Sequence, residues 1–168
     1  MASLSAAIAA APAQAATGAG SACPTTWGTG PRHSGQMVQT KVRDVRAGRH
    51  VCFDRLVIDL GSGQKPGYRV RYVRAFIAQG SGKVVHASGH AKLLVTVLAP
   101  AANRFPASNR HLARVAGFPE FRQVVGLGSF EGITSIGIGL RAKKPFRVLE
   151  LTSAGHRVRL IIDVALRG

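Results

Sequence analysis

From residue 36 onward, hydrophobic residues recur at every second position far more often than at every third or fourth. Glycine, proline, serine and asparagine interrupt this alternation at short intervals. A period of two places successive side chains on opposite faces of a β-strand, whereas a helix needs spacings of three and four. The pattern predicts an all-β fold, a single-domain antiparallel β-sandwich of about nine short strands. The predicted strands cover residues 37–45, 51–60, 68–77, 83–86, 91–98, 122–127, 134–140, 146–151 and 158–164.

The alternation also predicts which side chains face the core. In residues 158–164 the even positions hold only valine, leucine and isoleucine, so we expect that face to be buried. In residues 68–77 the aromatic and aliphatic residues at 68, 70 and 72 share one face. Arg69 and Arg71 then project together from the opposite face, which predicts a basic stripe.

Two segments differ from ordinary strands. In residues 134–140 large aliphatic residues alternate with serine and glycine, so one face carries almost no side chains, and another backbone or a ligand could approach it. Between residues 100 and 121 the β pattern stops, which predicts one long loop in which residues 112–116 could form a short helical turn. Loops of this length inside a compact domain are often functional, so we interpret it as a candidate binding loop.

The first residues have the character of an export signal. Residues 1–16 are small and apolar and end in Ala13-Gln14-Ala15, the A-x-A pattern that precedes signal-peptidase cleavage. We therefore assign residues 1–22 to a signal-peptide remnant with a flexible spacer and residues 23–168 to the folded domain; the alternative is a disordered Ala-rich tail. No later segment is apolar for long enough to span a bilayer.

Two cysteines, Cys23 and Cys52, are present. An even pair in an exported chain predicts a disulfide, which would stabilise the fold by ~3 kcal/mol in the chain-entropy model. The alternative makes Cys23 a lipid-attachment site, but the residue three positions before it is Gly20 rather than an aliphatic one.

The chain is strongly basic, with 23 Lys plus Arg against 7 Asp plus Glu and a formal net charge of +16. Such a surplus favours an anionic partner, which could be a wall polymer, an anionic lipid or nucleic acid. Arginine binds carboxylates and phosphates in bidentate fashion. Aromatic residues, which would stack on bases, make up only 6% of the chain, so nucleic acid is the less favoured partner. The alternative is that much of the charge only solvates the surface.

The sequence supplies no catalytic set, metal site or cofactor motif. The glycines in residues 126–132 have the wrong spacing for a dinucleotide-binding loop and precede a β pattern, so we interpret them as a turn. His86 and His90 lie outside any helical pattern and lack further ligands nearby, so no metal is expected. Glu131 is an acid in a glycine-rich turn, where it could contact a ligand, serve an unrecognised cell-wall hydrolase, or form a structural ion pair.

Several strings occur in an order that is similar to one protein family. They are Cys52-Phe-Asp-Arg-Leu-Val-Ile-Asp-Leu60, Pro66-Gly-Tyr-Arg-Val-Arg-Tyr-Val73, Gly128-Ser-Phe-Glu-Gly132 with Ile138-Gly-Leu140, Pro145-Phe-Arg-Val148 and Arg159-Leu-Ile-Ile-Asp-Val-Ala165. Together they resemble the AMIN-like domain family of exported bacterial proteins and lipoproteins, over about residues 23–165.

The resemblance implies a β-sandwich, because the family is similar to the AMIN domain, which is implicated in peptidoglycan binding and envelope localisation. It marks Asp54-Arg55, Tyr68, Glu131, Phe146-Arg147 and Asp163 as motif positions without assigning them a ligand.

From the residues and the resemblance together we expect a secreted, non-catalytic binding module without a cofactor. Its expected partner is peptidoglycan or another anionic wall polymer, with an envelope protein as a further candidate. The candidate ligand-binding residues are Arg69, Arg71, Glu131, Arg147 and Arg159.

Overall fold

The computed structural model describes Cys23 and residues 26–102 and 111–167. The predicted signal-peptide remnant and spacer, residues 1–22, lie outside the described residues. Within them the chain forms eleven strands and one 3-10 turn, η1. These are β1 (Arg32–Ser34), β2 (Val42–Arg49), β3 (Phe53–Ser62), β4 (Tyr68–Val73), β5 (Phe76–Ile77), β6 (Val84–Val85), β7 (Ala91–Val97), β8 (Phe121–Phe130), β9 (Ile133–Leu140), β10 (Phe146–Thr152), η1 (Ala154–His156) and β11 (Arg157–Ala165).

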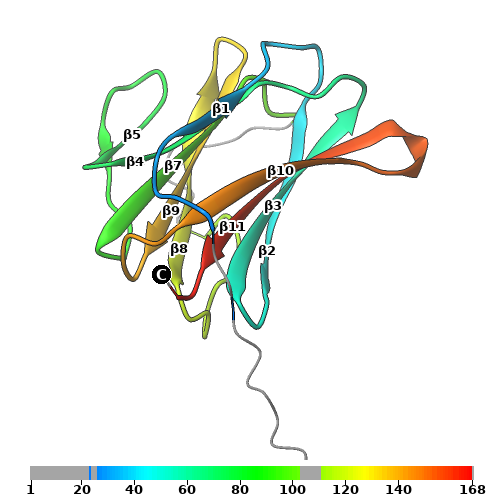
Figure 1. Ribbon diagram of the computed structural model, residues 1–168. Coiled ribbons are helices and arrows are strands. Elements are labelled where there is room, and N and C mark those ends of the chain that lie inside the picture. The colour runs from blue at the N-terminus through cyan, green and yellow to red at the C-terminus, as the bar shows by residue number, and fades with distance from the viewer. Residues whose placement is uncertain (1–22, 24–25, 103–110, 168) are drawn as a thin grey trace, which may run out of the picture.

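The strands form two main antiparallel sheets, which confirms the all-β fold class. One sheet has five strands in the order β1-β4-β7-β9-β8, and the other has four in the order β10-β11-β3-β2. The short strands β5 and β6 pair only with each other. The two main sheets face one another, and the β10–β11 hairpin extends beyond the edge of the sandwich (Figure 1).

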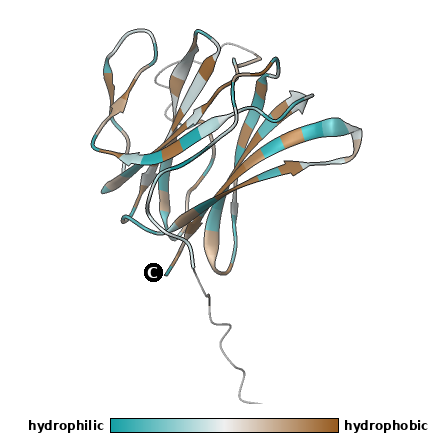
Figure 2. Ribbon diagram, turned by 45° about the horizontal axis from the view of Figure 1, so that its top comes forward, coloured by the Kyte–Doolittle hydropathy of each residue, from teal (hydrophilic) through white to brown (hydrophobic). Residues whose placement is uncertain are grey.

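The core lies between the two sheets. It contains Leu56 and Ile162 from the four-stranded sheet and Leu93 and Ile138 from the five-stranded sheet, all completely buried. Hydrophobic and hydrophilic residues alternate along many of the strands (Figure 2). The buried core between the sheets consists of hydrophobic residues. The predicted inward face of residues 158–164 is confirmed, because each of its four even-numbered residues is at most 1% exposed.

The largest differences from the predicted strand boundaries lie in three places. Residues 37–41 precede β2 instead of belonging to it, and the predicted strand 68–77 is divided into β4 and β5. The strand predicted over residues 122–127 is β8, and it continues to Phe130 because a bulge between Gly126 and Ser129 accommodates the glycines of this segment. β1 was not predicted at all.

The bulge also corrects the interpretation of residues 126–132 as a turn. Only Glu131 and Gly132 form the turn between β8 and β9, and both have positive φ, 48° and 79°. Two such residues between the paired Phe130 and Ile133 are typical of a type I′ hairpin.

The loop at residues 100–121 is described only in part, since residues 103–110 lie outside the described residues. In its described part the expected helical turn at 112–116 is absent, because Ala113 instead forms an isolated antiparallel bridge with Val124.

Other parts of the chain lie close to the face of β9 that carries serine and glycine, which agrees with the prediction that another backbone or a ligand could approach it. The ring of Phe76 lies over Gly137, where a Cβ atom would stand only 2.8 Å from Cε2 of that ring. The carbonyl oxygen of Ser88 would stand even closer to a Cβ atom at Gly139. A side chain and a backbone segment of the protein itself therefore occupy these positions, and the β5–β6 hairpin is held against the sheet through Phe76.

Two contacts attach neighbouring segments to β3. Cys23 and Cys52 form the predicted disulfide, with their Cα atoms 5.3 Å apart, so the segment before β1 is fixed to the start of β3. Asp54 is fully buried, and its Oδ2 atom accepts hydrogen bonds from the backbone N–H groups of Glu120 (2.7 Å) and Phe121 (2.9 Å). This carboxylate links the four-stranded sheet to the start of β8 in the five-stranded sheet.

Candidate anion-binding site

The outer face of the four-stranded sheet carries two groups of arginine and aspartate side chains. Odd-numbered residues of β3 point outward, because the even-numbered Leu56 and Ile58 are buried in the core. On the outer face Val57 pairs with Ile161 of β11, and both are nearly buried. This apolar pair separates an ionic cluster around Asp163 from a second one around Asp59.

The cluster around Asp163 is a structural element. Asp163 is fully buried and accepts hydrogen bonds from Arg55 Nε (2.6 Å) on β3 and Arg147 Nε (2.9 Å) on β10. The guanidinium carbon of Arg147 lies 4.3 Å from the ring centre of Trp27, and that of Arg55 lies 4.9 Å from the ring centre of Phe53. The hydrogen bond to Asp163 raises the pKa of Arg55. Arg147 is thus held between an acid and an aromatic ring, and its predicted role in binding a ligand stays a prediction.

The second cluster lines an open cleft of about 690 Å³ at the opposite end of the same face. We call it the arginine cleft and define it by Arg43 and Arg46 of β2, Asp59 of β3, and Arg157 and Arg159 of β11. Four arginines against one aspartate give it a formal charge of +3. The lining includes no aromatic side chain, so this site recognises charge and does not provide a stacking surface for rings.

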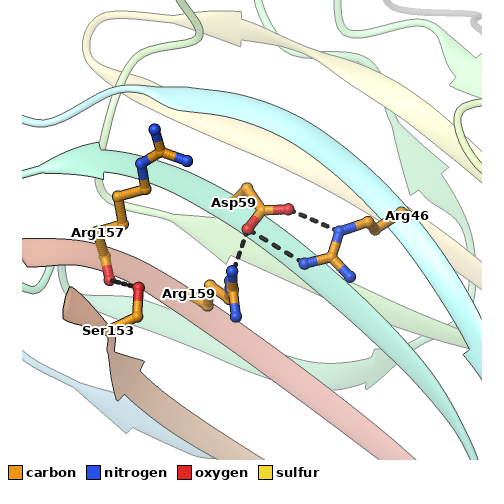
Figure 3. Close-up of polar contacts among 5 residues, drawn as sticks. All are labelled: Arg46, Asp59, Ser153, Arg157 and Arg159. Carbon is orange, nitrogen blue, oxygen red and sulfur yellow. Dashed lines mark hydrogen bonds and ion pairs between the residues drawn. The ribbon is translucent and has the colours of Figure 1, made fainter. Parts of the chain in front are cut away.

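Asp59 orients two of the four arginines (Figure 3). Arg46 donates to it twice, from Nε to Oδ2 (2.8 Å) and from Nη2 to Oδ1 (3.3 Å), and Arg159 Nε donates to Oδ1 (3.0 Å). Partial burial by itself raises the pKa of Asp59, but the hydrogen bonds and charges of Arg46 and Arg159 outweigh it and hold the pKa below its ordinary value. The carboxylate stays ionised at neutral pH and fixes both guanidinium groups at the cleft.

The other two arginines of the cleft are free to bind. Neither Arg43 nor Arg157 has a side-chain hydrogen bond or an ion pair with a described residue. Arg43 lies over the backbone of Gly61, where a Cβ atom would stand 3.3 Å from its Nε. Two oriented and two uncommitted guanidinium groups around one cavity suit a ligand that carries several negative charges.

The other predicted site residues lie elsewhere. Arg69 and Arg71 are exposed on the outer face of the five-stranded sheet, as the alternation indicated, and thus on the opposite side of the sandwich. Glu131 is exposed in the β8–β9 turn and has no ion pair or hydrogen bond with any residue that the structure describes. Of the five candidates, only Arg159 lines the arginine cleft.

Sequence reasoning missed Arg43, Arg46, Arg157 and Asp59 as members of one site. β2 and β3 are consecutive in the sequence but β11 lies about a hundred residues later, and the pairing of β3 with both strands brings these residues together. One sequence signal was available, because Asp59 is the outward-facing acid of its predicted strand and the segments that form β2 and β11 are rich in arginine.

In residues 26–102 and 111–167, no group of three or more His, Cys, Asp or Glu side chains could hold a metal ion. His90, for example, contacts the carbonyl oxygen of Arg141 at 3.1 Å. None of the helices in the described chain has the length and apolar character needed to span a membrane.

Fold and site together define an all-β sandwich domain with a cationic cleft on the outer face of its four-stranded sheet. The chain belongs to the AMIN-like domain family, because the model of that family matches residues 40–166. The match contains every strand from β2 to β11, and with them all five residues of the arginine cleft. No curated protein shows significant similarity to the chain.

Proposed function

We propose that this protein is an extracytoplasmic, non-catalytic binding module that associates with peptidoglycan or another anionic polymer of the cell envelope. Membership of the AMIN-like family supports the destination, and the disulfide between Cys23 and Cys52 supports an oxidising compartment. The observation that carries the proposal is the arginine cleft, in which Arg43 and Arg157 remain uncommitted while Asp59 orients their neighbours.

The shape of the cleft agrees with a polymer ligand. It is open along the surface of the sheet and includes the backbone of Gly61 and Gly155, so a chain could pass over it. A net charge of +3 from four arginines and one aspartate exceeds what a single carboxylate neutralises. Repeated anionic groups along a polymer would contact several guanidinium groups at once, and their combined contacts raise affinity.

Sedimentation of the mature protein with purified cell walls tests this proposal. We expect binding at low salt that weakens as salt rises, because exposed charges are screened. The double variant Arg43→Gln/Arg157→Gln should lose about tenfold or more in affinity, since two charge-assisted contacts disappear.

The matched control is Arg122→Gln/Arg141→Gln, which removes the same charge from exposed residues outside the cleft. It should change wall binding by no more than about twofold. An equal loss in both double variants would contradict a localised site, and retention of the wild type in the supernatant would contradict wall binding altogether. Tighter binding to DNA or to anionic liposomes than to walls would favour those partners instead.

A further inference from the structure

We propose that the β5–β6 hairpin and the outer face of the five-stranded sheet enclose a second binding site, which takes a carboxylate attached to a small apolar group. The site lies on the opposite side of the sandwich from the arginine cleft, so this inference goes beyond the proposed function. We call it the hairpin pocket and define it by the residues that line it, which are Arg71, Val73, Ala75, Ile77, Ala78, Gln79, Gly80, Gly82, Leu94, Thr96 and Ser135.

The pocket follows from the register of three strands. Thr96 of β7 pairs with Ser135 of β9, and the next outward row aligns Arg71 of β4 with Leu94 and Gly137. The ring of Phe76 fills the space above Gly137 and supports the hairpin at that point. Beside the ring, the hairpin and the sheet leave a cavity of about 410 Å³, which is within the usual range for small-molecule sites.

Three side chains of the hairpin pocket carry hydrogen-bond donors without an acceptor among the described residues. Arg71 has no ion pair or hydrogen bond with any described residue. Ser135 is 2% exposed, and its Oγ accepts a hydrogen bond from Gln79 Nε2 (2.7 Å), so its own proton is left without an acceptor in the described part of the chain. The hydroxyl group of Thr96 also has no hydrogen-bond partner among described residues. A guanidinium group and two hydroxyl groups, with no acid in the lining, favour an anionic ligand.

The remaining lining selects the class of anion. The walls include the aliphatic side chains of Val73, Ile77 and Leu94, which favour an apolar substituent beside the charge. One guanidinium group balances one negative charge and matches the two oxygens of a carboxylate in bidentate geometry. The arginine cleft, by contrast, has four arginines and Leu60 as its one aliphatic lining residue. The C-terminus of a short peptide that ends in a small residue has the chemistry that the hairpin pocket fits.

An NMR titration of the isotope-labelled protein with N-acetylalanine tests the inference. The probe carries one carboxylate and one methyl group, and N-acetylalaninamide is its uncharged counterpart. We expect shifts in the backbone amide signals of Leu94, Thr96, Ser135 and the hairpin residues 77–80. The amide should bind about tenfold more weakly or worse, because it cannot form the charged contact to Arg71. Inorganic phosphate is the third probe, and tighter binding of phosphate than of N-acetylalanine would overturn the assignment to a carboxylate.

Two single variants give the matched comparison. Arg71→Gln should weaken N-acetylalanine binding by about tenfold or more. Arg122→Gln removes the same charge from an exposed residue of β8 in the same sheet, outside the lining, and should leave the affinity within about twofold. Equal effects of both variants, or shifts that map to β2 and β11, would overturn the proposal. The variant Arg43→Gln/Arg157→Gln should titrate like the wild type, so failure of wall binding and failure of the hairpin pocket remain distinguishable.

Discussion

Several arginines on the outer face of the four-stranded sheet pair with acids, whereas two arginines on the outer face of the five-stranded sheet do not. On the four-stranded sheet two aspartates, Asp163 and Asp59, each hold a pair of arginines from neighbouring strands. On the five-stranded sheet Arg69 and Arg71 stand without an acid partner in the described structure. The comparison teaches that the neighbours across the sheet, and not the arginine itself, decide whether it supports the fold or remains available to a ligand.

The cause lies in the interior strands of each sheet. β3 and β11 are central in the four-stranded sheet and place acids on its outer face. β7 and β9 occupy the corresponding places in the five-stranded sheet, but their outward residues beside Arg69 are the neutral Thr96 and Ser135. An arginine beside a neutral residue keeps its hydrogen-bonding capacity for a ligand.

The largest effect on stability is expected when an acid of the four-stranded sheet is replaced. Asp163→Asn removes the charge that two guanidinium groups share and leaves them facing each other across a buried amide. We expect the free energy of unfolding to fall by about 2–3 kcal/mol, somewhat less than for a fully buried pair because both arginines are partly exposed. Chemical denaturation at pH 7 measures the loss. An unchanged midpoint would show that the cluster contributes nothing to the fold.

A smaller effect, of opposite sign, is expected at a buried acid that lacks a cation partner in hydrogen-bond contact. Glu120 is 3% exposed and accepts a hydrogen bond from the backbone N–H of Ala142 (2.7 Å). Burial raises the pKa of Glu120 above 4.5, so ionising this carboxyl group is less favourable in the folded than in the unfolded state. The protein therefore loses stability as pH rises from 4.5 through the folded pKa. Glu120→Gln keeps the acceptor and removes the charge. We expect the variant to be more stable than the wild type at pH 7, by less than the loss at Asp163.

The pH dependence of the stability difference distinguishes an effect of charge from an effect of packing. Melting temperatures of Glu120→Gln and the wild type should converge as pH falls below 4.5, where the wild-type carboxyl is protonated in both the folded and the unfolded state. A stability difference that is constant between pH 4 and pH 7 would mean that packing, and not charge, separates the two proteins.

At Asp59 stability and binding should move apart. The two ion pairs of Asp59 are largely solvent-accessible, so Asp59→Asn should lower the free energy of unfolding by no more than about 1 kcal/mol. Because the folded pKa of Asp59 is lowered, its contribution is present above pH 3.8 and disappears as pH falls through the folded pKa.

The same substitution raises the charge of the arginine cleft and frees Arg46 and Arg159 for a ligand. Wall binding at low salt should therefore become tighter by about two- to fivefold. Weaker binding would show instead that Asp59 is needed to orient the guanidinium groups for the polymer.

The fold could be predicted from the sequence because alternation is a local property. The inward face of β11 and the outward direction of Arg69 and Arg71 follow from the pleat of a single strand. The disulfide was also predictable, because two cysteines allow only one pairing. The bulge at Gly126–Ser129 and the division at residues 74 and 75 could not be predicted, since both depend on where a neighbouring strand lies.

The sites were much less accessible to sequence reasoning. The motif positions Asp54, Arg55, Arg147 and Asp163 are explained by packing, because the first attaches β8 and the other three form one ionic cluster. The arginine cleft depends on the pairing of β2 and β11 with β3, which no local pattern specifies. Single-strand periodicity can say that an arginine points outward, but it cannot say whether an acid stands beside it.

The smallest effect on stability is expected for the arginines of the five-stranded sheet. Arg69→Gln/Arg71→Gln should change the free energy of unfolding by no more than about 0.5 kcal/mol, because neither side chain has a partner to lose. The sign should be favourable, since a chain with a net charge of +16 gains from losing two positive charges.

Arg55→Gln/Arg147→Gln removes the same charge from the four-stranded sheet and leaves the buried Asp163 without its two ion-pair partners. Its free energy of unfolding should therefore fall by nearly as much as that of Asp163→Asn. Both pairs are compared by denaturation under identical salt. If the double variant at 69 and 71 loses as much free energy of unfolding as the one at 55 and 147, then arginines stabilise both sheets. The distinction between arginines that support the fold and arginines that are available to a ligand would then be wrong.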